Sequence, residues 1–320
     1  MSANSHKLGW IGIGRMGYPM AELLIQAGND VTIWNRTRSK AEPLAGATSR
    51  IVDAPKGLAQ VDVLFTMVAT GKDVEEVLFG ENGVAPGGNG KIPGIIVECS
   101  SISVEESAEI RRRVEGAGSM YIAAPVSGNG KTIKPGKLSC VASGPKAAFD
   151  LVKPYIETFA MRGVSYVGEG ELARICKIAH NIMLGVVIAN LAEITILANK
   201  AGVPRHAFLG FMNNSVMGSI FTRYKSNAFV NLDFTTTFTP ELLRKDLDLG
   251  LDAGTELNVA LPVTAAAREL VQSHFGAAQL KSDPEAYLAG DFAALIETVA
   301  LAAGMKLEPE NVPTPTGLEA

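Results

Sequence analysis

Three glycines at fixed spacing are the first residues of this sequence that suggest chemistry. Gly12-Ile13-Gly14-Arg15-Met16-Gly17 follows a short apolar run and opens an amphipathic segment. In a G-x-G-x-x-G motif the glycines allow a tight turn, a close approach of the backbone to a pyrophosphate and close helix-to-strand packing, while the helix N-terminus faces the phosphates. The motif alone is weak, but here it lies within a strand, loop, helix, strand unit. It predicts a dinucleotide site, with an ordinary glycine-rich turn as the alternative.

The end of the next apolar run bears on the choice of nucleotide. About twenty residues past the glycine loop, an NAD enzyme carries Asp or Glu for the ribose 2′-hydroxyl. This chain instead has Asn35-Arg36-Thr37. A carboxylate would repel a 2′-phosphate, whereas Arg36 can pair with it and its two neighbours can donate hydrogen bonds. We therefore expect NADP, with NAD still possible. The alternative is that Arg36 is a solvated residue of a surface turn, since more cations follow it.

A third set of polar residues lies on a long apolar stretch. Between Glu171 and Ala201 there is no proline and one internal glycine, which predicts a helix of roughly 45 Å at about 1.5 Å per residue. On it Arg174, Lys177 and Asn181 recur at i, i+3 and i+7, so that one polar stripe must face a cleft or a partner. A lysine on a long helix is more often a solvated surface residue, and this alternative stays open for Lys177.

The elements that must position these residues follow from the hydrophobic pattern. The first half alternates β-branched runs with helical patterns, as in a parallel sheet built from βαβ units. The expected strands are Leu8 to Ile13, Val31 to Trp34, Val61 to Val68, Ile95 to Cys99, Tyr121 to Pro125, Leu138 to Ala142 and Val164 to Val167. The expected shorter helices are Met16 to Ala27, Val74 to Leu78, Val104 to Glu115, Arg205 to Met212, Pro240 to Ala253, Pro262 to Phe275 and Phe292 to Ala303.

The strand-like runs stop after Gly170. We therefore predict an α/β fold: a Rossmann-type, doubly wound parallel sheet in a dinucleotide-binding domain over residues 1–167, and an all-helical substrate and oligomerisation domain over residues 168–320. The long helix joins the two domains and forms the spine of the second. The last dozen residues are rich in Pro and Glu, and we expect them to form a loose tail.

Composition excludes several classes of function. The 320 residues carry a formal net charge of −4 with a pI near 5.7, so there is no basic field for nucleic acid. The three cysteines are far apart, which predicts neither a disulfide framework nor a metal site and fits a reduced, cytoplasmic compartment. No secretory signal is expected in Met1 to Lys7. Ile182 to Ala198 is mostly apolar but is interrupted by polar residues, so a helix buried on most sides is expected there rather than a membrane span.

Together these segments resemble the β-hydroxyacid dehydrogenase family, which includes 3-hydroxyisobutyrate dehydrogenase and tartronate semialdehyde reductase. The resemblance covers nearly the whole chain. The segments that carry it are Gly12 to Ala21, Ala124-Pro125-Val126-Ser127-Gly128, Lys177 with Asn181, and Phe238 to Leu247, which contains Lys245-Asp246. As a set they are much more specific than the glycine loop alone.

The resemblance implies roles for the matching residues. Lys177 would be the catalytic lysine, the general acid when an aldehyde is reduced, and Asn181 on the same helix face could hold the same substrate oxygen. Further residues would line the site: Ser127, Gly128 and Asn129 around the substrate carboxylate, Ser101 between substrate and nicotinamide, and Val68, Ala69 and Lys245 beside the cofactor. Plainer interpretations stay open, because Ser127-Gly128 could be a turn, Lys245-Asp246 a helix ion pair, and His180 a structural histidine.

Two departures from the family pattern bear on substrate and register. The carboxylate loop usually begins with Asp and has a second glycine after Ser-Gly, where this chain has Ala123 and Asn129. The usual substrate is therefore in doubt, and a larger or more polar acid could fit. In addition, strict register from Gly168 and Gly170 would select Arg174 as the catalytic cation. We prefer Lys177, because the residues after it then align without a gap.

The expected reaction is hydride transfer between NADP(H) and a small 3-hydroxy acid or carboxylated semialdehyde. We expect a homodimer or homotetramer, since the long apolar helix would pack against another subunit. Two alternatives stay open: an imine reductase on the same fold, and a non-catalytic NADP-binding sensor or scaffold protein. The presence of Lys177 argues against the first, and Lys177 with Asn181 against the second.

Overall fold

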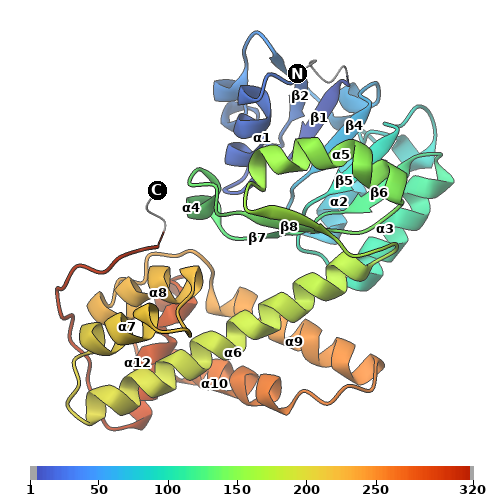
Figure 1. The fold of residues 1–320 in the computed structure, drawn as a ribbon. Helices are drawn as coiled ribbons and strands as arrows, with labels where there is room; N and C mark the ends of the chain where they lie inside the picture. Colours follow the sequence, from blue (N-terminus) through green and yellow to red (C-terminus); the bar gives the residue numbers. More distant parts are fainter. Residues whose placement is uncertain (1–5, 318–320) are drawn as a thin grey trace. The chain divides into compact units, whose positions relative to one another are not determined.

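The computed structural model describes residues 6–317, and Figure 1 shows them as two compact units. The first unit ends at Lys177 and the second begins at Ile178. The boundary expected from the sequence, between residues 167 and 168, lies ahead of the long helix and stays a prediction.

A six-stranded, all-parallel sheet forms the frame of the first unit. Its strands are β1 (Leu8–Ile11), β2 (Val31–Trp34), β3 (Ser49–Ile51), β4 (Val63–Thr66), β5 (Ile95–Glu98) and β6 (Met120–Ala123). The spatial order is β3-β2-β1-β4-β5-β6, so the order reverses between β1 and β4. In such sheets ligands bind outside the carboxyl ends of the strands at this switch point. The predicted Rossmann-type fold is confirmed.

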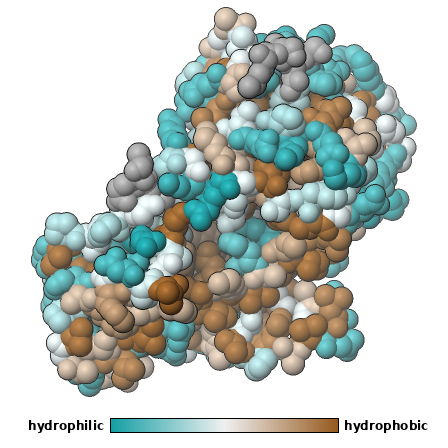
Figure 2. All heavy atoms as spheres, viewed as in Figure 1, coloured by the Kyte–Doolittle hydropathy of each residue, from teal (hydrophilic) through white to brown (hydrophobic). Residues whose placement is uncertain are grey.

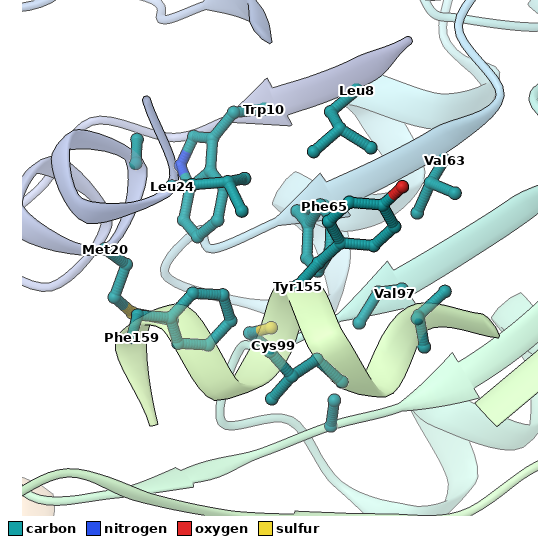
Figure 3. Close-up of a cluster of buried hydrophobic side chains, with 14 of the residues drawn as sticks. Leu8, Trp10, Met20, Leu24, Val63, Phe65, Val97, Cys99, Tyr155 and Phe159 are labelled. Carbon is teal, nitrogen blue, oxygen red and sulfur yellow. The ribbon is translucent and has the colours of Figure 1, made fainter. Parts of the chain in front are cut away.

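Helices cover the sheet, which explains why its central strands are almost entirely apolar. They are α1 (Gly17–Gln26), α2 (Gly71–Phe79), α3 (Val104–Gly116) and α5 (Lys146–Phe159). In the core drawn in Figure 3, Trp10 of β1 stacks on Phe65 of β4 with ring centroids 5.6 Å apart, and Phe159 of α5 meets Trp10 edge-on at 5.9 Å. α5 was not predicted from the sequence, because Pro154 lies inside it. Its apolar face, with Val152 and Ile156, overrides that proline.

A small second sheet follows β6 in the chain. It contains β7 (Val126–Ser127), β8 (Ser139–Ala142) and β9 (Gly163–Tyr166), with β7 antiparallel and β9 parallel to β8. The short helix α4 (Gly130–Ile133) lies between β7 and β8 in the sequence. The pattern predicted β8 and β9, whereas β7 and α4 are too short to leave a periodic signal.

All the elements of the second unit are helical, as expected. They are α6 (Leu172–Lys200), which begins in the first unit, α7 (Arg205–Asn214), α8 (Ile220–Asn231), α9 (Pro240–Glu256), α10 (Pro262–Ala278), α11 (Pro284–Leu288), the short 3₁₀ helix η5 (Phe292–Ala294) and α12 (Leu295–Ala302). Ile188 and Leu191 of α6 share one buried cluster with Leu247 of α9, Val271 of α10 and Ile296 of α12. Two helices were not predicted: α8, whose polar residues obscure its periodicity, and α11, which has only five residues.

α6 is the one helix within residues 6–317 whose length and composition alone would allow it to cross a membrane. One such helix is weak evidence for a membrane span, because the core helix of a globular protein meets the same criteria. Its first turn is buried in the first unit through Ala173, and its second half lies in the core of the second. The expectation of burial on most sides was too strong, since Met183 is 67% and Leu197 71% exposed. Apolar residues are frequent over the helical unit on the face shown in Figure 2.

The end of the chain, expected to be a loose tail, is anchored as far as residue 312. The carboxylate of Glu310 accepts hydrogen bonds from the backbone N–H groups of Arg205 and His206 at 2.7 and 2.9 Å, at the start of α7. Val312 exchanges two bonds with the side chain of Asn231. Since a carboxylate satisfies the open N–H groups of a helix start, this segment is held where composition predicted disorder.

Candidate active site

The glycine loop has the geometry that a dinucleotide needs. Gly12 has φ +99°, and a Cβ there would lie 2.1 Å from the carbonyl oxygen of Met67. A Cβ on Gly17 would lie 1.9 Å from the carbonyl oxygen of Gly12, so this glycine permits the close approach of the start of α1 to the loop after β1. By contrast, a Cβ on Gly14 would meet no protein atom within 4 Å. That open side, next to the start of α1, fits a pyrophosphate.

Asn35 supports this loop from the end of β2. Its Oδ1 accepts a 2.9 Å hydrogen bond from the backbone N–H of Ile13, and its Nδ2 donates to the carbonyl of Thr37 at 2.8 Å. The side chain therefore fixes the glycine loop relative to the Arg36 turn. One N–H of the amide remains for a ligand. This supporting role of Asn35 was not predicted from the sequence, which indicated only a contact with the ligand.

Two arginines of the same turn have different partners. Arg38 Nη1 lies 2.6 Å from Asp53 Oδ1 and its Nε 3.7 Å from Glu42. Arg36 has a side chain that is 87% exposed and a looser contact, 3.7 Å from Asp73 Oδ1 on α2. Exposed pairs at this distance are weak. The geometry therefore leaves Arg36 better able than Arg38 to turn toward a phosphate.

The ends of β4 and β5 bring together further residues expected at the site. The backbone N–H of Val68 donates to Ser100 Oγ at 2.9 Å, which ties the two segments to each other. Ser100 is buried, whereas Ala69 and Ser101 are exposed at this edge of the sheet. Since β1, β4 and β5 are parallel neighbours, their carboxyl ends place these residues on the same edge as the glycine loop.

Of the two cations that the spacing left open on α6, Arg174 is engaged in the protein interior. Its side chain is 1% exposed and forms an ion pair with Glu98 of β5. It also donates to the carbonyl of Ser100 at 2.6 Å and to Ser107 Oγ at 3.1 Å. The expectation that Arg174 shares a polar stripe facing a cleft or a partner is therefore wrong. Lys177, partly buried in the next turn, is the remaining candidate for the catalytic cation.

The expected carboxylate loop explains one departure from the family pattern. Gly128 has φ +138°, and a Cβ there would lie 2.3 Å from Thr132 Oγ1, so glycine is required. Asn129 has φ −135°, which any residue adopts, and its Oδ1 accepts from the N–H of Lys131 at 2.9 Å as the N-cap of α4. Asparagine thus stands in place of glycine because it caps this helix. Ala123 is a buried β6 residue whose backbone pairs with Ser143.

In the second unit, Asn181 has a partner that sequence reasoning missed. Its Nδ2 donates to Asp246 Oδ2 at 2.7 Å, and its Oδ1 lies 2.9 Å from His180 Nδ1. Asp246 is 7% exposed on α9, while the preceding Lys245 is exposed. The only hint in the sequence was a carboxylate among the apolar positions of α9. Glu98 left a similar hint, as the one charged residue at the end of a strand that is otherwise apolar.

Neither buried thiol in the first unit is a candidate nucleophile. Burial raises the pKa of the Cys140 thiol to about 12 and that of Cys99 well above its usual value. Both therefore stay protonated at neutral pH. Within residues 6–317, no three His, Cys, Asp or Glu side chains gather in a way that could hold a metal ion.

Two family models match successive parts of the chain. Residues 7–168 match the NAD binding domain of 6-phosphogluconate dehydrogenase, and residues 172–288 match the NAD-binding domain of NADP-dependent 3-hydroxyisobutyrate dehydrogenase. The 2-hydroxy-3-oxopropionate reductase of Escherichia coli (strain K12) is 32% identical over 308 residues, which cover 94% of this chain and 99% of that protein. The chain belongs to the β-hydroxyacid dehydrogenase family. It is an NAD(P)-dependent oxidoreductase.

Solved structures agree with this family. The 3-hydroxyisobutyrate dehydrogenase from Salmonella typhimurium superposes with a TM-score of 0.76 at 26% identity, covering 92% of this chain and 99% of that one. An imine reductase from Pseudomonas sp. has a TM-score of 0.56 at 19% identity over 92% and 99% of the two chains, a likeness that shows the fold alone. The individual site residues of this β-hydroxyacid dehydrogenase stay predictions.

Proposed function

We propose that the chain reduces a small carboxylated aldehyde to a 3-hydroxy acid, or catalyses the reverse reaction, and that it prefers NADP(H) to NAD(H). Lys177 is the general acid: its ammonium donates a proton to the carbonyl oxygen as the carbonyl carbon receives a hydride. When bound, NADPH supplies that hydride and is oxidised to NADP⁺. The aldehyde becomes an alcohol, and atoms and charge balance.

The observation that carries this proposal is the state of Arg174. Strict glycine spacing would have made it the catalytic cation, but it is buried and bound to Glu98. Lys177, one turn further along α6, is the cation left for proton transfer. Asn181 follows another turn along, and its bond to Asp246 orients the amide. In this scheme the amide holds the substrate oxygen beside Lys177.

Carboxylate binding is assigned to the loop after β7. Ser127 supplies a hydroxyl and Gly128 a backbone N–H at a glycine-dependent turn, and Asn129 lines the same loop with its own backbone N–H donated to Thr132 Oγ1 at 2.9 Å. The N-cap role of Asn129 turns its Oδ1 toward α4, and Lys134 is paired with Glu22 at 3.1 Å. These contacts leave less polar surface for a larger acid than the sequence suggested. A small substrate acid is therefore favoured.

The residues at the glycine loop fit a nucleotide, because the side of Gly14 on which a Cβ would project is open. Gly12 to Gly17, Val68, Ala69 and Ser101 would hold the dinucleotide, with Lys245 assigned to the same cofactor. The preference for the 2′-phosphate rests on Arg36, with Asn35 and Thr37 as hydrogen-bond donors. No carboxylate stands at the end of β2 to favour NAD.

The first test is a fluorescence titration with NADPH and NADH, followed by a panel of semialdehydes, ketones and cyclic imines. We expect tighter binding of NADPH and turnover with a carboxylated aldehyde. Turnover confined to imines would favour imine reduction. Binding without turnover would favour a sensor protein.

The second test is Lys177→Ala, with Lys153→Ala as the control. Lys153 is a helix α5 residue paired with Glu157 at 3.4 Å, outside the proposed site. The first variant should lose at least about 100-fold in kcat, since general acid catalysis contributes on that order, while the Kd for NADPH stays unchanged. Full activity in Lys177→Ala would exclude the assignment.

We further propose a homodimer or homotetramer, a cytoplasmic location, and a functional boundary between residues 167 and 168. The exposed apolar side chains of α6, Met183 and Leu197, support self-association, because solvent-exposed apolar patches often mark interfaces. Sedimentation equilibrium of the full chain, together with Leu197→Asp, tests the assembly. A monomeric wild type would exclude it.

A further inference from the structure

Arg174 occupies a position that is electrostatically unfavourable for a cation. It lies in the first turn of α6, near the positive end of the helix dipole, where a cation is disfavoured. It is also buried, and burial alone would lower the pKa of its guanidinium. The Glu98 carboxylate and the Tyr121 hydroxyl outweigh that effect and raise the pKa, so the side chain is charged. Neither helix stability nor core packing accounts for an arginine here.

Two partners of Arg174 lie at the end of β5 and in the segment that follows it. Beyond its ion pair with Glu98, it donates to the carbonyl of Ser100 at 2.6 Å. Glu98 uses its other oxygen to accept from the backbone N–H of Ser100 at 2.7 Å. Ser100 Oγ accepts in turn from the N–H of Val68 at 2.9 Å. A continuous hydrogen-bonded chain therefore runs from the first turn of α6 to the segments after β5 and β4.

These two segments carry the exposed residues assigned to the cofactor and substrate, Ala69 and Ser101. Lys177 follows Arg174 by three residues, about 4.5 Å along the helix axis. The position of the lysine's turn relative to Ser101 is therefore set by the bonds of Arg174. All of these residues belong to the first unit.

A buried ion pair is weak evidence for a purely stabilising role. Replacing both partners by uncharged residues is often neutral or stabilising, whereas removing one partner leaves an uncompensated charge. Geometric specificity is the better explanation for this pair, because the planar guanidinium contacts four different residues at once.

We propose that Arg174 and Glu98 are positioning residues of the active site, whose ion pair holds the first turn of α6, and with it Lys177, against the segment containing Ser100 and Ser101. This inference rests on the proposed function of Lys177.

The test compares Arg174→Met, Arg174→Lys and the double variant Glu98→Gln/Arg174→Met with the wild type. Arg112→Met is the control, because Arg112 pairs with Glu109 on the surface of α3. We expect Arg174→Met to lower both melting temperature and kcat. The double variant should regain most of the melting temperature but keep kcat at least about tenfold low, with a Kd for NADPH within about threefold of the wild type. Arg174→Lys should also stay slow, because an ammonium cannot replace the planar fork. A double variant with wild-type kcat overturns the inference, even if the single variant fails to fold.

A second measurement does not depend on turnover. Competitive labelling with acetic anhydride, analysed by mass spectrometry, gives the reactivity of the Lys177 amine relative to that of Lys153. In the double variant this ratio should change by at least about threefold, because the lysine's turn is no longer held. An unchanged ratio overturns the inference. A wild type without turnover would instead overturn the proposed function, and the labelling ratio would still decide whether Arg174 positions Lys177.

Discussion

Asn181 on α6 donates a 2.7 Å hydrogen bond to Asp246 on α9, beside a close crossing of the two helices. Each helix contributes a glycine to that crossing. A Cβ on Gly185 would lie 2.7 Å from the side chain of Leu247, and a Cβ on Gly250 would lie 2.4 Å from that of Ile182. The backbones can approach because neither glycine has a side chain. The bond therefore links two helices whose separation is already fixed by packing.

Asn181→Ala should lower both stability and kcat. The buried Asp246 carboxylate loses one hydrogen-bond donor, which typically costs about 1–3 kcal/mol. Asn190→Ala is the matched control, because Asn190 is exposed on the same helix. Urea unfolding and steady-state kinetics on the two variants check this expectation. Equal stability and equal kcat in both would mean that the bond has no role in either.

Gly12→Ala and Gly14→Ala should fail in different ways. At Gly12 the new methyl group would collide with the carbonyl of Met67 at a positive φ, so the variant should melt well below the wild type. At Gly14 the methyl group enters open space, so the melting temperature should be nearly unchanged. It would nevertheless occupy the side assigned to the pyrophosphate, and the Kd for NADPH should rise at least about tenfold. Differential scanning fluorimetry and nucleotide titration separate the two effects. Wild-type affinity in Gly14→Ala would contradict the assigned cofactor position.

Arg36→Ala should weaken NADPH binding selectively. Loss of a charge-assisted contact to a 2′-phosphate costs about 1.5–3 kcal/mol, or roughly 10- to 150-fold in Kd, while the Kd for NADH should change little. Arg38→Ala is the control, because Arg38 is already paired with Asp53. Isothermal titration of both nucleotides measures the four constants. A larger rise in the Kd for NADPH in Arg38→Ala than in Arg36→Ala would indicate that Arg38, and not Arg36, binds the 2′-phosphate.

Asp73→Asn should strengthen NADPH binding by a few-fold. Asp73 lies 3.7 Å from Arg36, competes with a phosphate for that cation and repels the phosphate itself. The effect should shrink at high salt, since exposed charges are screened over about 10 Å at 0.1 M ionic strength. Asparagine keeps much of the capping contact with Thr70. Titrations with NADPH at low and high salt test this prediction. An increase in affinity that does not depend on salt would indicate a structural change in α2 instead.

Most of the strands and the long helix were predictable because their signals are local, whereas the short β3 and β7 were not predicted. β2 is bounded as predicted, and α6 begins and ends within one residue of the expected span. α5 was not predictable, since local preference at Pro154 opposes a helix that the core stabilises through Phe149 and Phe159. Tertiary packing overrides such preferences, and a single sequence does not display it.

Parts of the site were predictable from the sequence only where a single residue type can fill a structural role. Gly12, Gly14 and Gly17 each have a distinct geometric reason, so the motif located the loop. The pairing of Arg174 with Glu98 joins residues 76 positions apart. Helix spacing alone therefore predicted that Arg174 lies on the same polar face as Lys177, whereas its side chain is buried. The amide of Asn35 had two possible uses, and the spacing could not show that its oxygen supports Ile13.

A last prediction concerns acid stability. His274 on α10 is buried, with Nδ1 2.8 Å from Thr298 Oγ1 and Nε2 without a hydrogen-bond partner in the described part of the chain. Burial lowers the pKa of His274 to about 4, against an ordinary value of about 6.5. Between these values the folded protein binds fewer protons than the unfolded chain. Stability should therefore fall as the pH drops from about 6.5 to about 4, by up to about 3 kcal/mol from this group, with no further loss from it below that range.

His274→Gln should flatten the acid side of the stability profile, because glutamine does not titrate. Thr298→Val should lower stability at every pH but keep the slope, since the imidazole remains. Urea midpoints measured from about pH 7 to about pH 4.5 give the comparison. Burial raises the pKa values of the Asp291 and Glu310 carboxyls, but Lys225 lowers that of Asp291 and contacts with His206 lower that of Glu310, and the lowering is larger in both cases. These two carboxylates therefore also lose stabilisation in acid. The difference between the profiles of the variants and the wild type isolates the histidine, and parallel profiles for wild type and His274→Gln would show that His274 does not titrate in this window.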